Sequence, residues 1–189
     1  PSQSIDNSIA DLVFDRESAT IIYGKAIREA PQGISQAVQS LGTKVVVVGD
    51  VFANEIKELR NGKNVVTFSI TDYSGSLLIK CFIKAEDKEE LKALSGIKSG
   101  ATLLVSGKID YDEYARDICI LANSIIKVKR VPKTDNYPEK RVELHCHSNM
   151  SAMDAVTDPV KLISRAAEWG HQAMAITDHG CVQAFPDCM

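Results

Sequence analysis

Alternation of apolar and polar residues with a period of two most constrains how this chain can fold. In residues 64–71, Val66, Phe68 and Ile70 fall on one face, and mostly polar residues fall on the other. This period is typical of a strand with one buried face. Further runs predict strands at residues 44–59, 77–84, 101–111 and 117–128, which makes five strands in all.

Turn signals and one helix set the order of these strands. The dipeptide Asn61-Gly62 favours a hairpin between the first two strands, and residues 72–75 form the next turn. An acidic start followed by apolar positions predicts a helix over residues 86–98, and Gly107 predicts a bulge in the fourth strand. Three strands, a helix and two strands within about 90 residues are the order of an OB-fold, a five-stranded Greek-key barrel.

The segments around this predicted barrel, residues 43–131, differ from it in pattern. Residues 1–42 show no sustained period and contain several breakers, so we expect a linker or the tail of an upstream domain. Residues 132–140 hold two prolines among polar residues and predict a second linker.

Residues 141–189 belong to another fold class. A short strand at 141–145, a helix from Asp158 to Gly170 and an apolar strand at 173–177 predict a βαβ unit with a right-handed crossover. An α/β barrel needs roughly 250 residues, so this segment is only its truncated start. The predicted fold class is therefore mainly β, a barrel with one helix, followed by incomplete α/β structure.

Histidines gather at the predicted ends of the two α/β strands. His145 and His147 leave the first strand, Asp154 follows, and His179 leaves the second. Residues i and i+2 share a face of an extended chain, and the C-terminal ends of parallel strands meet at one edge. Imidazoles with a carboxylate suit zinc, manganese or iron better than magnesium or calcium. Chance clustering of surface histidines is the alternative, and we expect His171 to be structural.

The second half of the chain carries a specific family signature. RVELHCHSNMSAMDAV, followed by KLISRAAEWGHQAMAITDHGCVQAFPD, resembles the opening of a PHP (polymerase and histidinol phosphatase) domain in bacterial DNA polymerase III alpha subunits. The preceding module, with ITDYSGSLLIKCF and the region around ARDICILAN, is similar to the PolC type of Gram-positive bacteria. The resemblance implies that His145, His147, Asp154 and His179 belong to the first group of PHP metal ligands.

This resemblance also implies a function for the parent enzyme. It would be a DNA-directed DNA polymerase of bacterial replication, a nucleotidyltransferase with an inserted 3'-5' exonuclease, and its barrel would contact single-stranded or primer-template DNA. The implied cofactors are zinc, manganese or iron at the PHP site and magnesium at the polymerase site. Replisome subunits such as the sliding clamp would be partners. The remaining PHP ligands would follow Met189, so we expect no polymerase or complete PHP activity from this segment alone.

One strand of the predicted barrel suggests a surface for DNA. Lys80, Phe82 and Lys84 alternate with apolar residues and therefore share the outer face of the third strand. An aromatic ring between two lysines fits base stacking beside phosphate contacts. Arg60 and Lys63 flank the first hairpin turn and extend this surface. A packed Phe82 with solvated lysines is the alternative reading.

Composition excludes other classes. The formal net charge of −3 gives no overall attraction to nucleic acid, so binding must use a local patch. No run reaches the roughly 18 apolar residues of a membrane span, and no secretory signal begins the sequence, so we expect a cytoplasmic protein without membrane contact. The five cysteines are irregularly spaced, which predicts reduced thiols.

Two other functions fit parts of the pattern. The barrel could be a tRNA- or RNA-binding module of the kind attached to aminoacyl-tRNA synthetases, but residues after Pro138 show His-x-His in place of synthetase motifs. The chain could also be a PHP-type metal-dependent phosphoesterase with an accessory barrel. The short α/β segment argues against that reading.

Overall fold

The computed structural model describes residues 8–9, 12–59, 62–84 and 86–189. The chain divides into two compact units, Pro1–Pro132 and Lys133–Met189. Within the described residues, no helix is both long enough and apolar enough to cross a bilayer.

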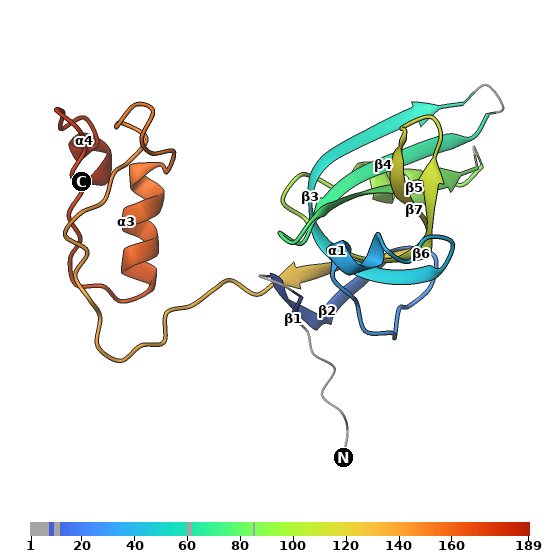
Figure 1. The fold of residues 1–189 in the computed structure, drawn as a ribbon, viewed down its shortest axis with the longest axis horizontal. Helices are drawn as coiled ribbons and strands as arrows, with labels where there is room; N and C mark the ends of the chain where they lie inside the picture. The colour runs from blue at the N-terminus through green and yellow to red at the C-terminus, as the bar shows by residue number, and fades with distance from the viewer. Residues whose placement is uncertain (1–7, 10–11, 60–61, 85) are drawn as a thin grey trace, which may run out of the picture. The chain divides into compact units, whose positions relative to one another are not determined.

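The first unit is a seven-stranded sheet that closes on itself (Figure 1). Its strands are β1 (Ser8–Ile9), β2 (Leu12–Tyr23), β3 (Lys44–Glu58), β4 (Asn64–Thr71), β5 (Ser76–Ile83), β6 (Thr102–Asp112) and β7 (Asp117–Arg130). The order is β1-β2-β7-β5-β4-β3-β6, and β6 also pairs with β7 to close the barrel. The five strands predicted from the sequence are present in OB-fold order, with β7 parallel to β5.

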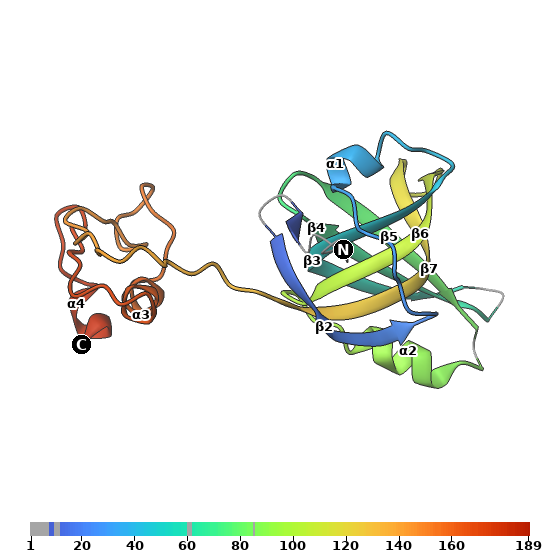
Figure 2. The same cartoon turned by 90° about the horizontal axis from the view of Figure 1, so that it is seen from below.

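Two helices lie at opposite sides of this barrel in Figure 2. α1 (Ile34–Ala37) is a short turn, and α2 (Lys88–Ser95) is the predicted helix between β5 and β6. Leu94 of α2 and Ile34 of α1 are buried in the same apolar cluster as the inward faces of the strands. In β4 this face consists of Val66, Phe68 and Ile70, as the period of two predicted.

Residues 12–42 are not a linker, which corrects the sequence-based expectation. β2 runs antiparallel to the C-terminal half of β7, and Leu12 and Phe14 are 0% and 1% exposed. They form a second apolar cluster with Val46 and Val48 of β3, among others. Because this segment covers the outer side of the barrel wall, β3 buries side chains on both of its faces.

Two polar features fix this arrangement. The buried carboxylate of Asp72 accepts the Ile34 N–H at 2.7 Å and the Ser74 N–H at 2.9 Å, so it joins α1 to the β4–β5 turn. A bulge interrupts the pairing between Ser106 and Gly107, but the extra residue, Asn123, lies in β7 and not in the fourth strand, where the bulge was predicted. A Cβ on Gly107 would lie 2.3 Å from the Leu121 carbonyl oxygen, so only glycine fits.

The second unit contains α3 (Pro159–Glu168) and α4 (Phe185–Cys188). As predicted, Asp158 caps α3, its side chain accepting the Lys161 N–H, and Gly170 follows with a φ of 77°. The predicted strands are reduced to one parallel bridge between Glu143 and Met174. Many apolar side chains here stay exposed, so little core supports longer strands.

The predicted linker at residues 132–140 also packs more closely than expected. The Lys133 carbonyl oxygen accepts a hydrogen bond from Trp169 Nε1, and Asp135 lies 2.9 Å from Lys140 and 3.5 Å from His171. From residue 133 onward this segment is therefore held by the second unit.

Candidate metal centre and nucleic-acid interface

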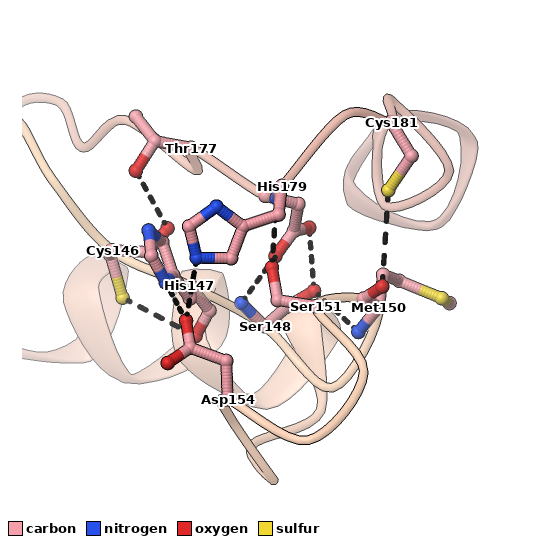
Figure 3. Close-up of polar contacts among 10 residues, drawn as sticks. Cys146, His147, Ser148, Met150, Ser151, Asp154, Thr177, His179 and Cys181 are labelled. Atoms are coloured by element: carbon pink, nitrogen blue, oxygen red, sulfur yellow. Dashed lines mark hydrogen bonds and ion pairs between the residues drawn. The ribbon is translucent and has the colours of Figure 1, made fainter.

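Three of the four predicted metal ligands converge in the second unit. One ligand atom from each of His147, Asp154 and His179 lies within 4.8 Å of the other two. Asp154 Oδ2 contacts His147 Nδ1 and lies 3.0 Å from His179 Nε2 (Figure 3). The two imidazole rings meet edge to face, with centroids 4.3 Å apart. The loops after residues 145 and 177 thus bring their side chains to one place.

The fourth predicted ligand, His145, lies beside this group. Its ring centroid is 4.7 Å from that of His147, but its nitrogens are not part of the three-ligand cluster. His171 has structural contacts instead, as expected, with its Nδ1 3.0 Å from the Arg141 carbonyl oxygen.

Sequence reasoning missed the residues that hold the two loops together. The Asp178 carboxylate accepts hydrogen bonds from the Ser148 N–H and hydroxyl, both at 2.7 Å, and from the Ser151 hydroxyl at 2.8 Å. Ser151 Oγ in turn accepts the His179 N–H at 3.0 Å. A carboxylate directly before His179 was the available sequence signal. Asp178 therefore positions both imidazole-bearing loops.

The electrostatics of the cluster favour ionised carboxylates. Hydrogen bonding from His147 is the largest cause that holds the pKa of Asp154 below its usual value. Burial acts to raise the pKa of Asp178, but its hydrogen bonds from Ser148 and Ser151 outweigh burial, so this pKa is also lowered. Burial raises the pKa of the nearby Cys146 thiol, which disfavours a thiolate ligand.

The donor set fits a divalent metal ion. His147 Nε2 is buried and has no hydrogen-bond partner, an arrangement that normally costs free energy. Imidazole nitrogens and one carboxylate are the ligands that zinc and other first-row transition metals prefer. A cation at this place would neutralise the Asp154 carboxylate, which His147 meets through Nδ1, and the unpaired Nε2 would reach the same cation only after the imidazole ring turns.

The predicted DNA-binding residues on the barrel have different surroundings. Phe82 is 49% exposed on the outer face of β5. Lys84, directly after β5, and Lys63, directly before β4, are also exposed. The Lys80 side chain is only 15% exposed, and its ammonium group pairs with Asp112 at the end of β6. Arg60 lies outside the described residues.

Two exposed aromatic residues near that turn were not predicted. Tyr111 ends the outer part of β6 with 54% exposure, and Tyr114 in the β6–β7 turn is 99% exposed. The signal in the sequence that could have identified them is the placement of one tyrosine on each side of the acidic pair at 112–113. They flank Asp112, the residue at the end of β6 that pairs with Lys80.

Comparison with models of known protein families identifies the class of protein to which this chain belongs. The chain belongs to the OB-fold nucleic acid binding domain family, whose model matches residues 45–148. A PHP domain model matches residues 143–189. These two matches agree with the mainly β first unit and the histidine-bearing second unit.

The relatives with curated names are more specific. The chain is 47% identical over 166 residues to the DNA polymerase III PolC-type of Clostridium perfringens, covering 88% of this chain and 11% of that protein. It is 44% identical over 146 residues to the DNA polymerase III PolC-type of Bacillus subtilis, covering 76% of this chain and 10% of that protein. The resemblance seen in the motifs is confirmed, and the chain spans about a tenth of these relatives.

An aspartyl tRNA synthetase from Entamoeba histolytica aligns with 55% of this chain and 22% of its own, at a TM-score of 0.43 and 18% identity. Both the PHP match and the polymerase relatives imply divalent metal use.

Proposed function

We propose that this chain is a segment of a PolC-type replicative DNA polymerase, in which the barrel binds single-stranded or template DNA and the second unit holds a divalent metal ion. Nucleotidyl transfer with magnesium and 3'-5' exonuclease activity would belong to other segments of such an enzyme. Its partners would be primer-template DNA and replisome subunits such as the sliding clamp, and it would act in the cytoplasm.

The convergence of His147, Asp154 and His179 carries this proposal. These residues would hold zinc, manganese or iron, and His145 would serve as a further ligand because its ring already lies beside His147. When bound, such an ion acts as a Lewis acid and lowers the pKa of water for phosphoester hydrolysis. Asp178 orients the two loops, and the buried Nε2 of His147 supplies a nitrogen with no competing protein donor.

Metal titration of the chain tests the site. Calorimetry with manganese and with zinc should show one site per chain, and His147→Ala or Asp154→Asn should weaken binding more than 100-fold, since each removes a ligand. His171→Gln is the matched control, because this imidazole lies in the same unit outside the cluster. Equal affinity in the wild type and His147→Ala would refute the site.

Binding of fluorescent single-stranded DNA tests the barrel. Phe82 offers a half-exposed ring, and loss of one base-stacking ring weakens binding by roughly 1–3 kcal/mol. Phe82→Ala should therefore lower the affinity about 5- to 100-fold. Val65→Ala, at the position that pairs with Phe82 across β4 and β5, controls for local packing. Unchanged affinity of Phe82→Ala would remove this residue from the interface.

A further inference from the structure

A second basic surface lies on the barrel, away from Phe82. A hollow of about 620 Å³ is bordered by the loop after α2, the start of β6 and the end of β7. Its ten lining residues include four cations, Lys98, Lys127, Lys129 and Arg130, and no carboxylate. A concave surface lined by one sign of charge concentrates counter-ions, so this hollow is suited to anions.

The three lysines have charges that the protein leaves uncompensated. Among the described residues, no carboxylate lies within ion-pair distance of Lys98, Lys127 or Lys129, whereas Lys44, Lys57 and Lys108 are each paired with a carboxylate. Asp15 faces Lys129 across β2 and β7 and offsets part of this charge, although its carboxylate makes no ion pair with Lys129 and accepts the Glu17 N–H at 2.9 Å. The hollow therefore keeps a net positive charge.

The backbone that carries these lysines is rigidly fixed. The Gly100 N–H donates to the Val51 carbonyl at 2.7 Å and the Val51 N–H donates to the Ala101 carbonyl at 2.8 Å, which anchors the loop bearing Lys98. Lys127 and Lys129 stand in β7, where β2 and β6 pair on either side, at Thr20 and Leu103 for Lys127. A pre-ordered surface loses less conformational entropy when it binds.

Arg130, which lines the hollow, pairs with the aromatic ring of Tyr73. Arg130 Nη1 lies 2.5 Å from the Asp50 carboxylate and donates to the Tyr73 hydroxyl at 2.8 Å, and its Cζ lies 5.1 Å from the centroid of the Tyr73 ring. Asp50 also accepts the Thr102 hydroxyl at 2.6 Å. Tyr73 is 55% exposed, and its ring lies against Arg130, whose position in β7 alternates with those of Lys127 and Lys129. Proteins that bind single-stranded nucleic acid combine aromatic rings, which stack on bases, with cationic side chains, which contact phosphates.

This surface is distinct from the one around Phe82. Thr71 pairs with Asp50 and Val65 pairs with Phe82, so the two places are separated along β4. At about 3.3 Å per residue this separation is roughly 20 Å. One ligand could reach both places only if it is extended.

We propose that the hollow lined by Lys98, Lys127, Lys129 and Arg130 binds the phosphate backbone of single-stranded nucleic acid as a second contact of the barrel. This inference rests on the DNA-binding part of the proposed function and adds the path of the strand. The lysines bind successive phosphates, Arg130 is held in place by Asp50, and Tyr73 stacks on a base.

The salt dependence of DNA binding by the full chain tests this path. Three phosphate contacts contribute roughly 2 to the slope of log K against log salt for single strands. The variant with Lys98→Ala, Lys127→Ala and Lys129→Ala should lose this part of the slope for a fluorescent oligonucleotide. Lys44→Ala with Lys108→Ala is the control, because both lysines are exposed and already paired with carboxylates. Tyr73→Phe and Tyr73→Ala separate loss of the hydroxyl from loss of the ring, and only loss of the ring should weaken binding.

The outcomes distinguish this inference from the proposed function. An unchanged slope in the triple variant, with binding that Phe82→Ala still weakens, overturns the hollow and leaves the barrel a DNA-binding module. No binding by the wild type overturns both. If the triple variant lost binding to phosphatidylserine vesicles while its salt slope for DNA stayed unchanged, the hollow would be a membrane surface, and this result would also overturn the inference. Circular dichroism checks that each variant is folded.

Discussion

Truncation of Phe14 to alanine would measure how firmly β2 is integrated into the barrel. Phe14 is 1% exposed and belongs to the outer apolar cluster with Val46, Val48 and Ile126. Removal of a fully buried phenylalanine side chain loses its transfer free energy and leaves a cavity, which costs about 3–4 kcal/mol. In a unit of this size the loss corresponds to a decrease in melting temperature of roughly 10–15 °C.

Urea unfolding followed by far-UV circular dichroism is the suitable assay. The single tryptophan, Trp169, belongs to the second unit, so its fluorescence does not report on the barrel. Val13 precedes Phe14 on the opposite face of β2 and is 41% exposed, so Val13→Ala should stay within about 0.5 kcal/mol of the wild type. If the two variants were equally stable, β2 would not be an integral layer of the fold.

Three further changes test other parts of the structure. Asp178→Asn removes no ligand but weakens the support of both histidine loops, so manganese affinity measured by calorimetry should fall about 10- to 100-fold, and an unchanged affinity would exclude its positioning role. Gly107→Ala places a Cβ against the Leu121 carbonyl and should destabilise the barrel by about 2 kcal/mol or more in urea unfolding; wild-type stability would show that the bulge relaxes freely. The hydrogen bond from Lys80 is the largest cause that lowers the pKa of Asp112. A carboxyl group whose pKa is lowered in the folded state stabilises the fold at pH values above its unfolded pKa near 3.9, and this stabilisation is lost as the group is protonated in acid. Lys80→Met should therefore be less stable than the wild type at pH 7, by roughly 1 kcal/mol, with a smaller difference below about pH 4, and a constant difference across pH would contradict this linkage.

The five barrel strands and α2 could be predicted because their signals are local. In β4 the side chains of Val66, Phe68 and Ile70 alternate with polar ones, and a strand with one buried face requires that alternation. The Asp158 cap and Gly170 define α3 in the same way, since both act within a few residues. The residues that specify each of these elements lie within it, although the strands pair their backbone groups with neighbouring strands.

The layer formed by β2 required information that local patterns do not contain. The run Val45–Val48 is continuously apolar, which is typical of a strand buried on both faces, but it does not identify the covering segment. That segment is β2, which pairs with β7 more than 100 residues later in the sequence, as Phe14 with Arg130 illustrates. Its own burial pattern is irregular because only one part faces the cluster.

For the site, the sequence by itself determined the ligand types. The spacing of His145, His147 and His179 and the intervening Asp154 predicted a histidine-rich cluster, because strand ends deliver such residues to a common edge. Only the tertiary structure decided which of them meet: the carboxylate of Asp178 ties the two loops so that His147 and His179 share Asp154 while His145 stays beside them. The reason is physical, since residue type and local conformation are written along the chain, whereas contacts between distant segments depend on how the whole fold packs.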